Sequence, residues 1–312
     1  MSGARPLPHA RDLRRVVVRA SAHKPDAEHL AREFTHALER LGVTVVAGAD
    51  RGAWEALDDV DLVVSVGGDG TLLDVARRLR GRDVPVLGVN VGKLGFLAGF
   101  DPAAFRRYLD GAAPEGWRRD EVMLLQARVN GGPPHVAMND VAVSQGVMTR
   151  VLQIDTWIDD EHAIAYRADG LVVATPVGST AYSLSLGGPI LARDLRAFVV
   201  TPIAPHGLTH RAIVVGATSH LAFAVGGRVD EVALLVDGQE RIDLAPGDRV
   251  VVEAAPGGVT LLSSGALGPY GVMREKLGWG VGPALTPDPR DAADADAARE
   301  ASATGETDPP ES

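Results

Sequence analysis

The chain contains no cysteine among its 312 residues. This absence excludes disulfides, thiolate nucleophiles and cysteine-ligated zinc. Lysine is also scarce, because only Lys24, Lys93 and Lys276 are lysines among 31 basic residues. An acidic chain that is poor in lysine and rich in Ala and Val indicates either adaptation to high salt or a GC-rich genome, and composition leaves both explanations open.

Long apolar runs are missing as well. No window approaches the ~18 uninterrupted apolar residues that a membrane helix needs, and residues 1–15 lack the apolar core of a signal peptide. We therefore expect a cytoplasmic protein without a membrane segment. The sequence has no HExxH spacing and no Gly-x-Ser-x-Gly around Ser179 or Ser183, so a zinc enzyme or a serine hydrolase is disfavoured.

The charge balance is acidic and unevenly distributed. A formal net charge of −10 argues against a general nucleic-acid binder. Residues 283–312 contain eight acidic side chains and two arginines, so we expect an acidic disordered tail there. The length of the chain allows two domains, and 46% apolar residues are enough for a substantial core.

The first part of the chain alternates strand and helix patterns. The helix expected from residue 25 places Phe34, Leu38 and Leu41 on its apolar side and ends at Gly42. This alternation predicts a parallel sheet covered by helices, in a Rossmann-like α/β domain over residues 12–116. The expected strands are 15–20, 43–46, 61–66 and 85–89, and the expected helical segments are 25–41, 74–80 and 102–109.

After Gly116 the helical patterns give way to short strands separated by turn signals. Residues 117–267 are therefore expected to form an antiparallel, β-sandwich-like domain. The expected strands are 122–129, 135–144, 151–158, 163–166, 170–174, 198–201, 212–215, 221–225, 232–236 and 249–254, and the expected turns are 130–132, 159–160, 226–227, 237–238 and 256–258.

The stretch Gly67-Gly68-Asp69-Gly70-Thr71 follows an apolar run and precedes a helical pattern. A strand, a glycine turn and a helix N-terminus form a phosphate-binding arrangement, because glycines let the backbone approach the phosphate closely. A carboxylate is repelled by a neighbouring phosphate, so its presence there indicates a function. Asp69 would either bind a metal or take the proton of an attacking hydroxyl. The alternative is an ordinary turn or N-cap residue.

Two further stretches suit a nucleotide. Residues 90–97 form a second glycine-rich loop after a strand, where Lys93 either meets a phosphate or is a plain surface residue. In residues 167–189, a strand ends at Thr175, a turn at residues 178–180 is expected to expose hydroxyl groups, and Tyr182 offers an aromatic face. The alternative is a turn of small residues that caps a helix. His206 is interpreted as structural.

In family order, these motifs resemble the NAD kinase family over residues 16–280. GGDG alone is also found in lipid kinases and phosphofructokinases, whereas the long stretch at residues 169–190 is a feature of NAD kinases. The matching motifs are GGDGT (67–71), NVGKLGFL (90–97), an Asn-acid pair (139–140), DGLVVATPVGSTAYSLSLGGPI (169–190), TPIAPH (201–206) and DGQ (237–239).

The resemblance implies an NAD kinase / diacylglycerol kinase-like architecture in which residues 268–282 return to the first domain. It implies transfer of the terminal phosphate of ATP, or of polyphosphate, to the 2′-hydroxyl of the adenosine ribose of NAD. Mg²⁺ accompanies the donor without a direct protein ligand, and the family forms homodimers or homotetramers. No nucleic-acid or membrane partner is implied.

The resemblance also assigns roles to individual residues. Asp69 is the expected general base, and the backbone of the glycine turn serves the phosphates. The Asn-acid pair is expected to hold the adenosine. Residue 169 and the 180–185 loop are expected to contact NAD, and positions 167, 204 and 239 match peripheral contacts. The nucleotide-binding set is Gly67, Gly68, Gly70, Thr71, Asn139, Asp140, Arg167, Asp169, Thr180, Ala181, Tyr182, Ser183, Leu184, Ser185, Ala204 and Gln239.

Two positions depart from the family pattern. The acid of the Asn-acid pair is usually Glu and is Asp140 here, and many members carry a basic residue where this chain has Asp74. A phosphate contact in place of that basic residue is expected from Arg77, Arg78 or Lys93. The rival interpretations are a lipid or other small-molecule kinase and a catalytically silent NAD(P)-binding sensor. The sequence leaves open the preferred donor, the use of NADH, dimer versus tetramer, feedback by NADP and the role of the tail.

Overall fold

The computed structural model describes residues 9–49, 51–55, 57–79, 82–92, 95–112, 116–146, 151–207, 209–226, 231–265 and 267–279. The chain divides into two units, residues 1–266 and 267–312. In the described part of the second unit, helix α5 (Pro269–Leu277) ends at Gly278, whose φ of 67° suits a glycine cap. The expected tail at 283–312 lies outside the described residues, and the return of residues 268–282 to the first domain stays a prediction.

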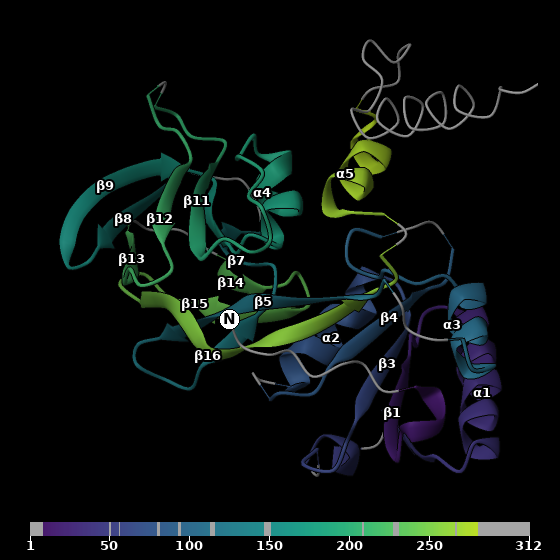
Figure 1. Ribbon diagram of the computed structural model, residues 1–312. Coiled ribbons are helices and arrows are strands. Elements are labelled where there is room, and N and C mark those ends of the chain that lie inside the picture. The colour runs from purple at the N-terminus through teal and green to yellow at the C-terminus, as the bar shows by residue number, and fades with distance from the viewer. Residues whose placement is uncertain are drawn as a thin grey trace, which may run out of the picture. The chain divides into compact units, whose positions relative to one another are not determined.

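The first part of unit 1 is the expected parallel α/β arrangement (Figure 1). Its four strands lie in the order β2-β1-β3-β4, and β1 pairs in parallel with both β2 and β3. The predicted order of strands and longer helices is confirmed. The strand boundaries shift by at most one residue, whereas the helix expected over 74–80 begins five residues earlier, at Asp69, and the short helices η1 and η2 were not predicted. The elements are η1 (Ala10–Asp12), β1 (Arg15–Ala20), α1 (Pro25–Arg40), β2 (Thr44–Ala47), η2 (Arg51–Trp54), β3 (Leu62–Gly67), α2 (Asp69–Leu79), β4 (Val86–Asn90) and α3 (Pro102–Leu109).

Helices cover both faces of these strands. On one face α1 and α3 pack through residues such as Phe34 and Phe105, whose rings meet edge to face at 4.8 Å. On the other face α2 buries Leu72 and Ala76. The expectation that Leu41 lies on the buried side of α1 is wrong, because it is 37% exposed. Leu41 follows the last helical turn and caps the helix end instead of continuing its apolar stripe.

The second part of unit 1 is antiparallel. Among the described residues, six strands form one sheet in the order β12-β11-β10-β7-β14-β15, and its inner face packs on β5, β8, β13 and β16. The elements are β5 (Arg118–Val129), β6 (His135–Ala137), β7 (Asp140–Gln145), β8 (Leu152–Ile158), β9 (Glu161–Ala168), β10 (Gly170–Ala174), η3 (Gly178–Thr180), α4 (Tyr182–Ser185), β11 (Ala197–Ile203), β12 (Ile213–Gly216), β13 (Leu221–Gly226), β14 (Val232–Val236), β15 (Glu240–Leu244) and β16 (Arg249–Ser263).

Several turn predictions are confirmed by backbone geometry. Asp159 and Asp160 have φ of 52° and 65°, and Asp237 and Gly238 have φ of 48° and 63°. Two consecutive residues with positive φ make the tight turn that joins twisted antiparallel strands. These turns close the β8–β9 and β14–β15 hairpins. The β15 strand itself is absent from the sequence prediction, because its charged residues lack a strong apolar alternation.

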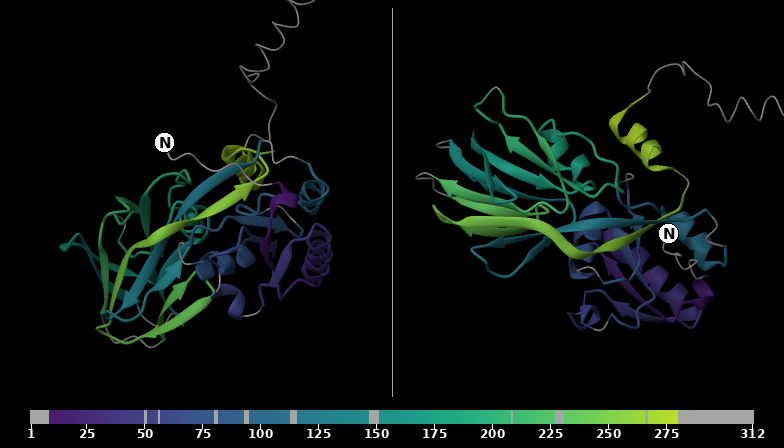
Figure 2. Two further views of the ribbon diagram at one scale, coloured as in Figure 1. Left: turned by 60° about the horizontal axis from the view of Figure 1, so that its bottom comes forward. Right: turned by 60° about the vertical axis from the view of Figure 1, so that its left-hand side comes forward.

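Strand β16 differs most from expectation. It was expected to end at a turn over 256–258, but it continues to Ser263 through a register shift between Ala254 and Gly258. Pro256 lies in this bulge, where no ladder donor is needed. Beyond the bulge, Leu261 and Leu262 pair in parallel with β4, so the parallel and antiparallel strands share one sheet (Figure 2, right view, long yellow-green arrow).

Candidate functional site

Asp69, the first residue of α2, holds the second glycine-rich loop. Its Oδ2 accepts the N–H of Phe96 at 2.8 Å, and its Oδ1 accepts the N–H groups of Leu97 and Ala98 at 3.1 and 3.2 Å. A Cβ on Gly95 would lie 2.0 Å from Oδ1, so the loop reaches the carboxylate only because residue 95 is glycine. Asp69 is therefore not a simple N-cap, because its partners lie outside its own helix.

Arg193 approaches the same loop from the other side. Its Nη2 donates to the carbonyl of Phe96, so this one peptide segment is held by Asp69 at its N–H and by Arg193 at its C=O. Burial lowers the pKa of the Arg193 guanidinium, whereas the nearby carboxylates of Asp120 and Asp69 favour its charged form. Arg193 thus ties the segment that follows α4 to the surroundings of Asp69.

The glycine turn lies at the carboxyl edge of the parallel strands. A Cβ on Gly67 would lie 2.4 Å from Thr71 Oγ1, so the turn closes tightly on the start of α2. The amides of Thr71 and Leu72 both point to the carbonyl of Gly68 at 3.0 and 3.2 Å. Gly70 is exposed and Asp69 is half-buried, which leaves this edge open to a ligand.

Asp237, at the tip of the β14–β15 hairpin, organises the Asn-acid pair. Its Oδ1 accepts the N–H groups of Asn139 and Asp140 at 2.8 and 3.2 Å, and its Oδ2 accepts that of Met138 at 3.0 Å. These bonds explain why the expected strand over 135–144 is interrupted between β6 and β7. The side chain of Asp237 is completely buried.

The segment at residues 178–182 packs on the Asn-acid pair next to Asp140. Burial, reinforced by the nearby Asp237 carboxylate, raises the pKa of Asp140 from 3.8 to about 7, although a hydrogen bond from the Tyr182 backbone opposes the rise. A Cβ on Gly178 would lie 2.0 Å from the carbonyl oxygen of Asn139, so η3 packs directly on the Asn-acid pair. The motifs at 139–140, 178–182 and 237 therefore meet in space.

A polar bridge joins this cluster to the glycine turn. Gln239 donates from Nε2 to the carbonyl of Gly70 at 3.0 Å and accepts from Nη2 of Arg77 at 2.6 Å. The other nitrogen of Arg77, Nη1, lies 3.3 Å from Asp237 Oδ2. Gly70, Gln239, Arg77 and Asp237 thus form a continuous path between the two clusters.

The loop at 178–185 uses its hydroxyl groups differently from the expectation. Ser179 and Ser183 are completely buried. Ser179 Oγ donates to the Pro176 carbonyl at 2.6 Å, and Ser183 Oγ lies 2.9 Å from Thr201 Oγ1. The expectation that the turn at 178–180 exposes its hydroxyl groups is wrong for Ser179, which is buried and, like Ser183, holds the loop together. Tyr182 is 41% exposed and Ser185 is exposed, so they face outward with the partly exposed Thr180, Ala181 and Leu184.

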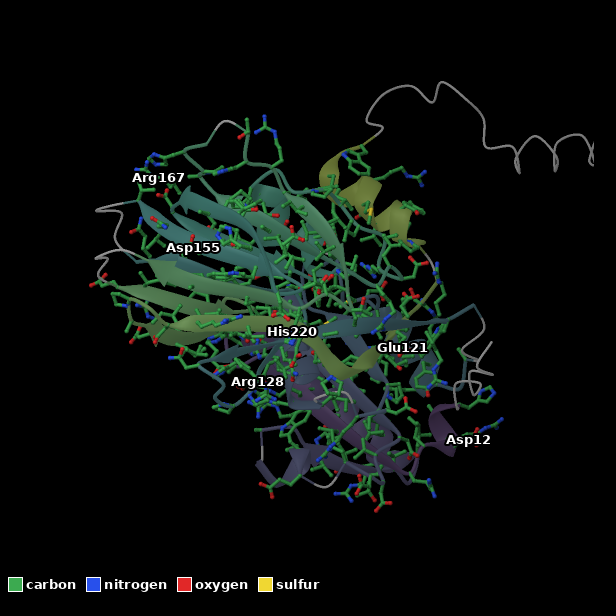
Figure 3. The ribbon with its side chains drawn as sticks, turned by 90° about the vertical axis from the view of Figure 1, so that its left-hand side faces the viewer. Asp12, Glu121, Arg128, Asp155, Arg167 and His220 are labelled. Carbon is green, nitrogen blue, oxygen red and sulfur yellow. The ribbon has the colours of Figure 1, made fainter. Side chains whose placement is uncertain are left out.

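Arg167, Asp169 and Ala204 lie elsewhere. Asp169 precedes β10, whose other end at Ala174 pairs with Asp140. Five strand residues separate these ends by roughly 17 Å. The Arg167 carbonyl accepts the His206 N–H at 2.8 Å, and Ala204 has φ of 43°. Figure 3 places the exposed Arg167 at the end of the β-rich part that is remote from Asp12. Within a single chain, these three residues therefore lie far from Asp140.

The basic residues near Asp74 are engaged with other groups. Asp74 accepts from Arg19 Nε at 3.1 Å and from Arg78 Nε at 3.0 Å. The Arg78 guanidinium also lies 5.4 Å from the Trp54 ring centroid, and Arg77 faces the β14–β15 hairpin. Arg77 and Arg78 were expected to contact a phosphate in place of the missing basic residue. Both side chains are instead bound to other protein groups. Lys93 lies outside the described residues.

The sequence reasoning missed three polar residues of this region: Lys24, Arg193 and Asp237. Lys24 Nζ donates to the Val91 carbonyl at 2.8 Å and lies 3.4 Å from the position that a Cβ would take on Gly68. A detectable signal was the rarity of lysine, together with the position of Lys24 just after the first strand. Asp237 belongs to the expected turn at 237–238 and to the family motif at 237–239, but it was given no role of its own in the site. Arg193 had no local signal.

No group of three or more His, Cys, Asp or Glu side chains within the described ranges is arranged to hold a metal ion. At the glycine turn, both carboxylate oxygens of Asp69 already accept N–H groups. No helix in the described part of the chain is long and apolar enough to cross a membrane.

The sequence matches two family models and many curated proteins. Residues 13–113 match the ATP-NAD kinase N-terminal domain, and residues 138–263 match the ATP-NAD kinase C-terminal domain. An NAD kinase of Syntrophotalea carbinolica is 36% identical over 286 residues, which cover 86% of this chain and 99% of that protein. An NAD kinase of Rhodopirellula baltica is 42% identical over 229 residues, covering 71% of this chain and 72% of that protein.

Solved structures share the fold. The crystal structure of yeast NADH kinase complexed with NADH superimposes with a TM-score of 0.78 at 25% identity, and the match covers 91% of each chain. The structure of an NAD kinase from Archaeoglobus fulgidus in complex with ATP gives a TM-score of 0.64 at 28% identity, covering 80% of this chain and 93% of that one. The likeness therefore extends over sequence and fold together.

Proposed function

The chain belongs to the NAD kinase family, whose members are phosphotransferases with an alcohol group as acceptor, and we propose that it transfers the terminal phosphate of ATP to the 2′-hydroxyl of the adenosine ribose of NAD. One observation carries this proposal. The path through Gln239 and Arg77 joins the glycine turn, the proposed phosphate site, to the Asn139-Asp140 pair, the proposed adenosine site.

Asp69 is the proposed general base. Each carboxylate oxygen has two lone pairs. From the described residues, Oδ1 accepts two N–H groups and Oδ2 accepts one, which leaves a lone pair on Oδ2 for the proton of the ribose hydroxyl. The fixed carboxylate would remove this proton as the oxygen attacks the terminal phosphorus and ADP leaves. Positioning of the two reactants supplies most of the remaining acceleration.

The acceptor site is proposed around the Asn-acid pair. Asn139 Oδ1 is buried and has no hydrogen-bond partner among the described residues, so it is available to a donor group of the ligand. Asp140 lies beside it, and the exposed ring of Tyr182 offers a stacking surface. Arg167, Asp169 and Ala204 are proposed to serve the site of a neighbouring copy in a homodimer or homotetramer, because they lie far from Asp140 within one chain.

The divalent cation is proposed to be Mg²⁺ that enters with the donor. Mg²⁺ keeps several water ligands and commonly binds substrate phosphates, and the N–H groups around Asp69 leave this carboxylate little room for direct ligation. The cation supplies charge neutralisation on the phosphates. The protein residues orient the hydroxyl and receive its proton.

The test is NADP formation from NAD, ATP and Mg²⁺, followed with an NADP-specific dehydrogenase at low and at molar KCl. Asp69→Asn is compared with wild type, and NAD binding is measured by calorimetry for both. Loss of a general base is expected to lower kcat by ~10²–10⁴, with NAD affinity within about twofold. Polyphosphate in place of ATP, and NADH in place of NAD, complete the substrate comparison.

Two outcomes for wild type would contradict the proposed activity, and a third, for the variant, would contradict the role of Asp69. Wild type that binds NAD but makes no NADP at either salt concentration would support a silent NAD-binding sensor. Wild type that binds no NAD would shift the search to other hydroxyl acceptors, lipids first. An Asp69→Asn variant as fast as wild type would leave the family activity intact and remove Asp69 as the base.

A further inference from the structure

Two neighbouring parallel strands send their helices to opposite faces of the sheet. Strand β1 pairs with β3 from Val16↔Leu62 to Ala20↔Val66. The following helices, α1 and α2, pack in different cores on the two faces (Figure 1). In open parallel sheets, ligands bind outside the carboxyl ends of strands where the connections diverge in this way. The ends of β1 and β3 are such a point.

Lys24 occupies this point. The chain leaving β1 is fixed to β3, because the Ser21 amide donates to the Val66 carbonyl at 2.9 Å. Three residues later, Lys24 Nζ donates to the carbonyl of Val91, which follows β4, at 2.8 Å. The same ammonium lies 3.4 Å from the Cβ position of Gly68. The loops after β1, β3 and β4 therefore converge on one positive charge.

The charge of Lys24 has no acidic partner within the described ranges, since none of their ion pairs includes this residue. An ammonium carries three N–H donors, and the Val91 carbonyl accounts for one of them. Arg77 and Arg78, in contrast, already face carboxylates. Among the described residues, Lys24 is thus a basic side chain that lies over the glycine turn and has N–H donors left for a ligand.

We propose that Lys24 binds the phosphate chain of the donor nucleotide beside Gly68, in place of the basic residue that Asp74 replaces. This inference rests on the proposed kinase function and names a binding residue for its donor. The Val91 contact keeps the flexible lysine stem in place, and the absence of a side chain at Gly68 leaves room for a phosphate next to the ammonium. Because the proposed contact of Lys24 is to the phosphates of the donor, Lys24 is expected to affect the binding of ATP more than the binding of NAD.

The test compares Lys24→Gln and Lys24→Arg with wild type. Lys24→Gln is expected to raise the KM for ATP about 10- to 100-fold, the range for a charge-assisted hydrogen bond, while the KM for NAD changes less than about twofold. Lys24→Arg is expected to recover part of the loss, since the charge is retained. Calorimetry with ATP and with inorganic tripolyphosphate should show the same weakening without turnover.

The matched control is Arg32→Gln, which removes one exposed positive charge from α1 and should change neither KM. The Lys24 side chain makes no capping bond to α1, so its replacement is expected to leave thermal unfolding nearly unchanged. An unchanged KM for ATP in Lys24→Gln overturns the proposal. A raised KM for NAD with an unchanged KM for ATP also overturns it, by moving the ammonium to the acceptor. Failure of the kinase function itself is distinct, because wild type would then form no NADP.

Discussion

Arg77 on α2 and Asp237 on the β14–β15 hairpin lie 3.3 Å apart across 160 residues of sequence. This contact connects the helix of the glycine turn with the carboxylate that holds the amides of Asn139 and Asp140. The Arg77 side chain is 16% exposed and that of Asp237 is fully buried. The pair therefore belongs to the interior of the molecule and not to its solvated surface.

Removal of Arg77 is expected to destabilise the fold. Breaking a buried ion pair typically costs 3–5 kcal/mol, but three amide donors remain on Asp237, so Arg77→Gln should cost roughly 2 kcal/mol. Urea unfolding measures this difference. The matched control is Arg78→Gln, because Arg78 is more exposed and its pair with Asp74 should contribute less than ~1 kcal/mol. Equal losses for the two variants would contradict a special role for the Arg77–Asp237 contact.

Gly95 is expected to be essential for the position of Asp69. A Cβ at Gly95 would lie 2.0 Å from Oδ1, so Gly95→Ala must displace the 95–98 loop or the carboxylate. A displacement of ~1 Å at reacting groups can cost ~10²-fold in rate, and we expect kcat to fall roughly 10- to 100-fold with NAD affinity preserved. Gly52→Ala is the control, because open space surrounds Gly52. Steady-state kinetics in which both variants retain the wild-type kcat would argue against this geometry.

Arg193 is expected to act as a positioning residue through Phe96. Arg193→Ala removes the donor to the Phe96 carbonyl, so the loop that presents N–H groups to Asp69 should loosen. We expect kcat to fall about 10-fold, while the KM values for ATP and NAD stay within about twofold. Arg193→Lys should restore part of the rate because it retains charge and one donor. A loss confined to thermal stability, with kcat unchanged, would assign Arg193 a purely structural role.

Asp140 is expected to make stability depend on pH. Its pKa is raised from 3.8 to about 7 in the folded state, so the folded protein binds this proton more tightly than the unfolded chain. The stabilisation is complete below pH ~4 and is lost as the pH rises toward 7, a change of at most about 4 kcal/mol. Asp140→Asn should remove this dependence, so its stability relative to wild type should rise between pH 4.5 and 7.5.

Urea unfolding at several pH values measures the Asp140 effect. Asp243→Asn is the control, because the Asp243 side chain is 82% exposed and its ion pair within the described residues is with Arg241 on the same strand. Its stability relative to wild type should stay nearly constant across the same range. A parallel pH dependence in Asp140→Asn and wild type would show that other groups cause the effect.

The sequence by itself determined the local features of this protein. The order of strands and helices follows from apolar spacing, and the tight hairpins follow from residues such as Asp159 and Gly238 that accept positive φ. The glycine turn at 67–70 and the family motifs are equally local. Each of these features depends on residues that are close in sequence, so local backbone preferences are enough to predict it.

Only the tertiary structure decided which polar groups meet. Asp69 takes its partners 27 to 29 residues away, and Arg193 reaches a carbonyl 97 residues away. The convergence of Lys24 on Gly68 depends on the neighbouring positions of β1 and β3, and the continuation of β16 depends on β4 and β5 as partners. The physical reason is that hydrogen bonds and ion pairs require proximity in space, and strand order creates that proximity without a local sequence signal.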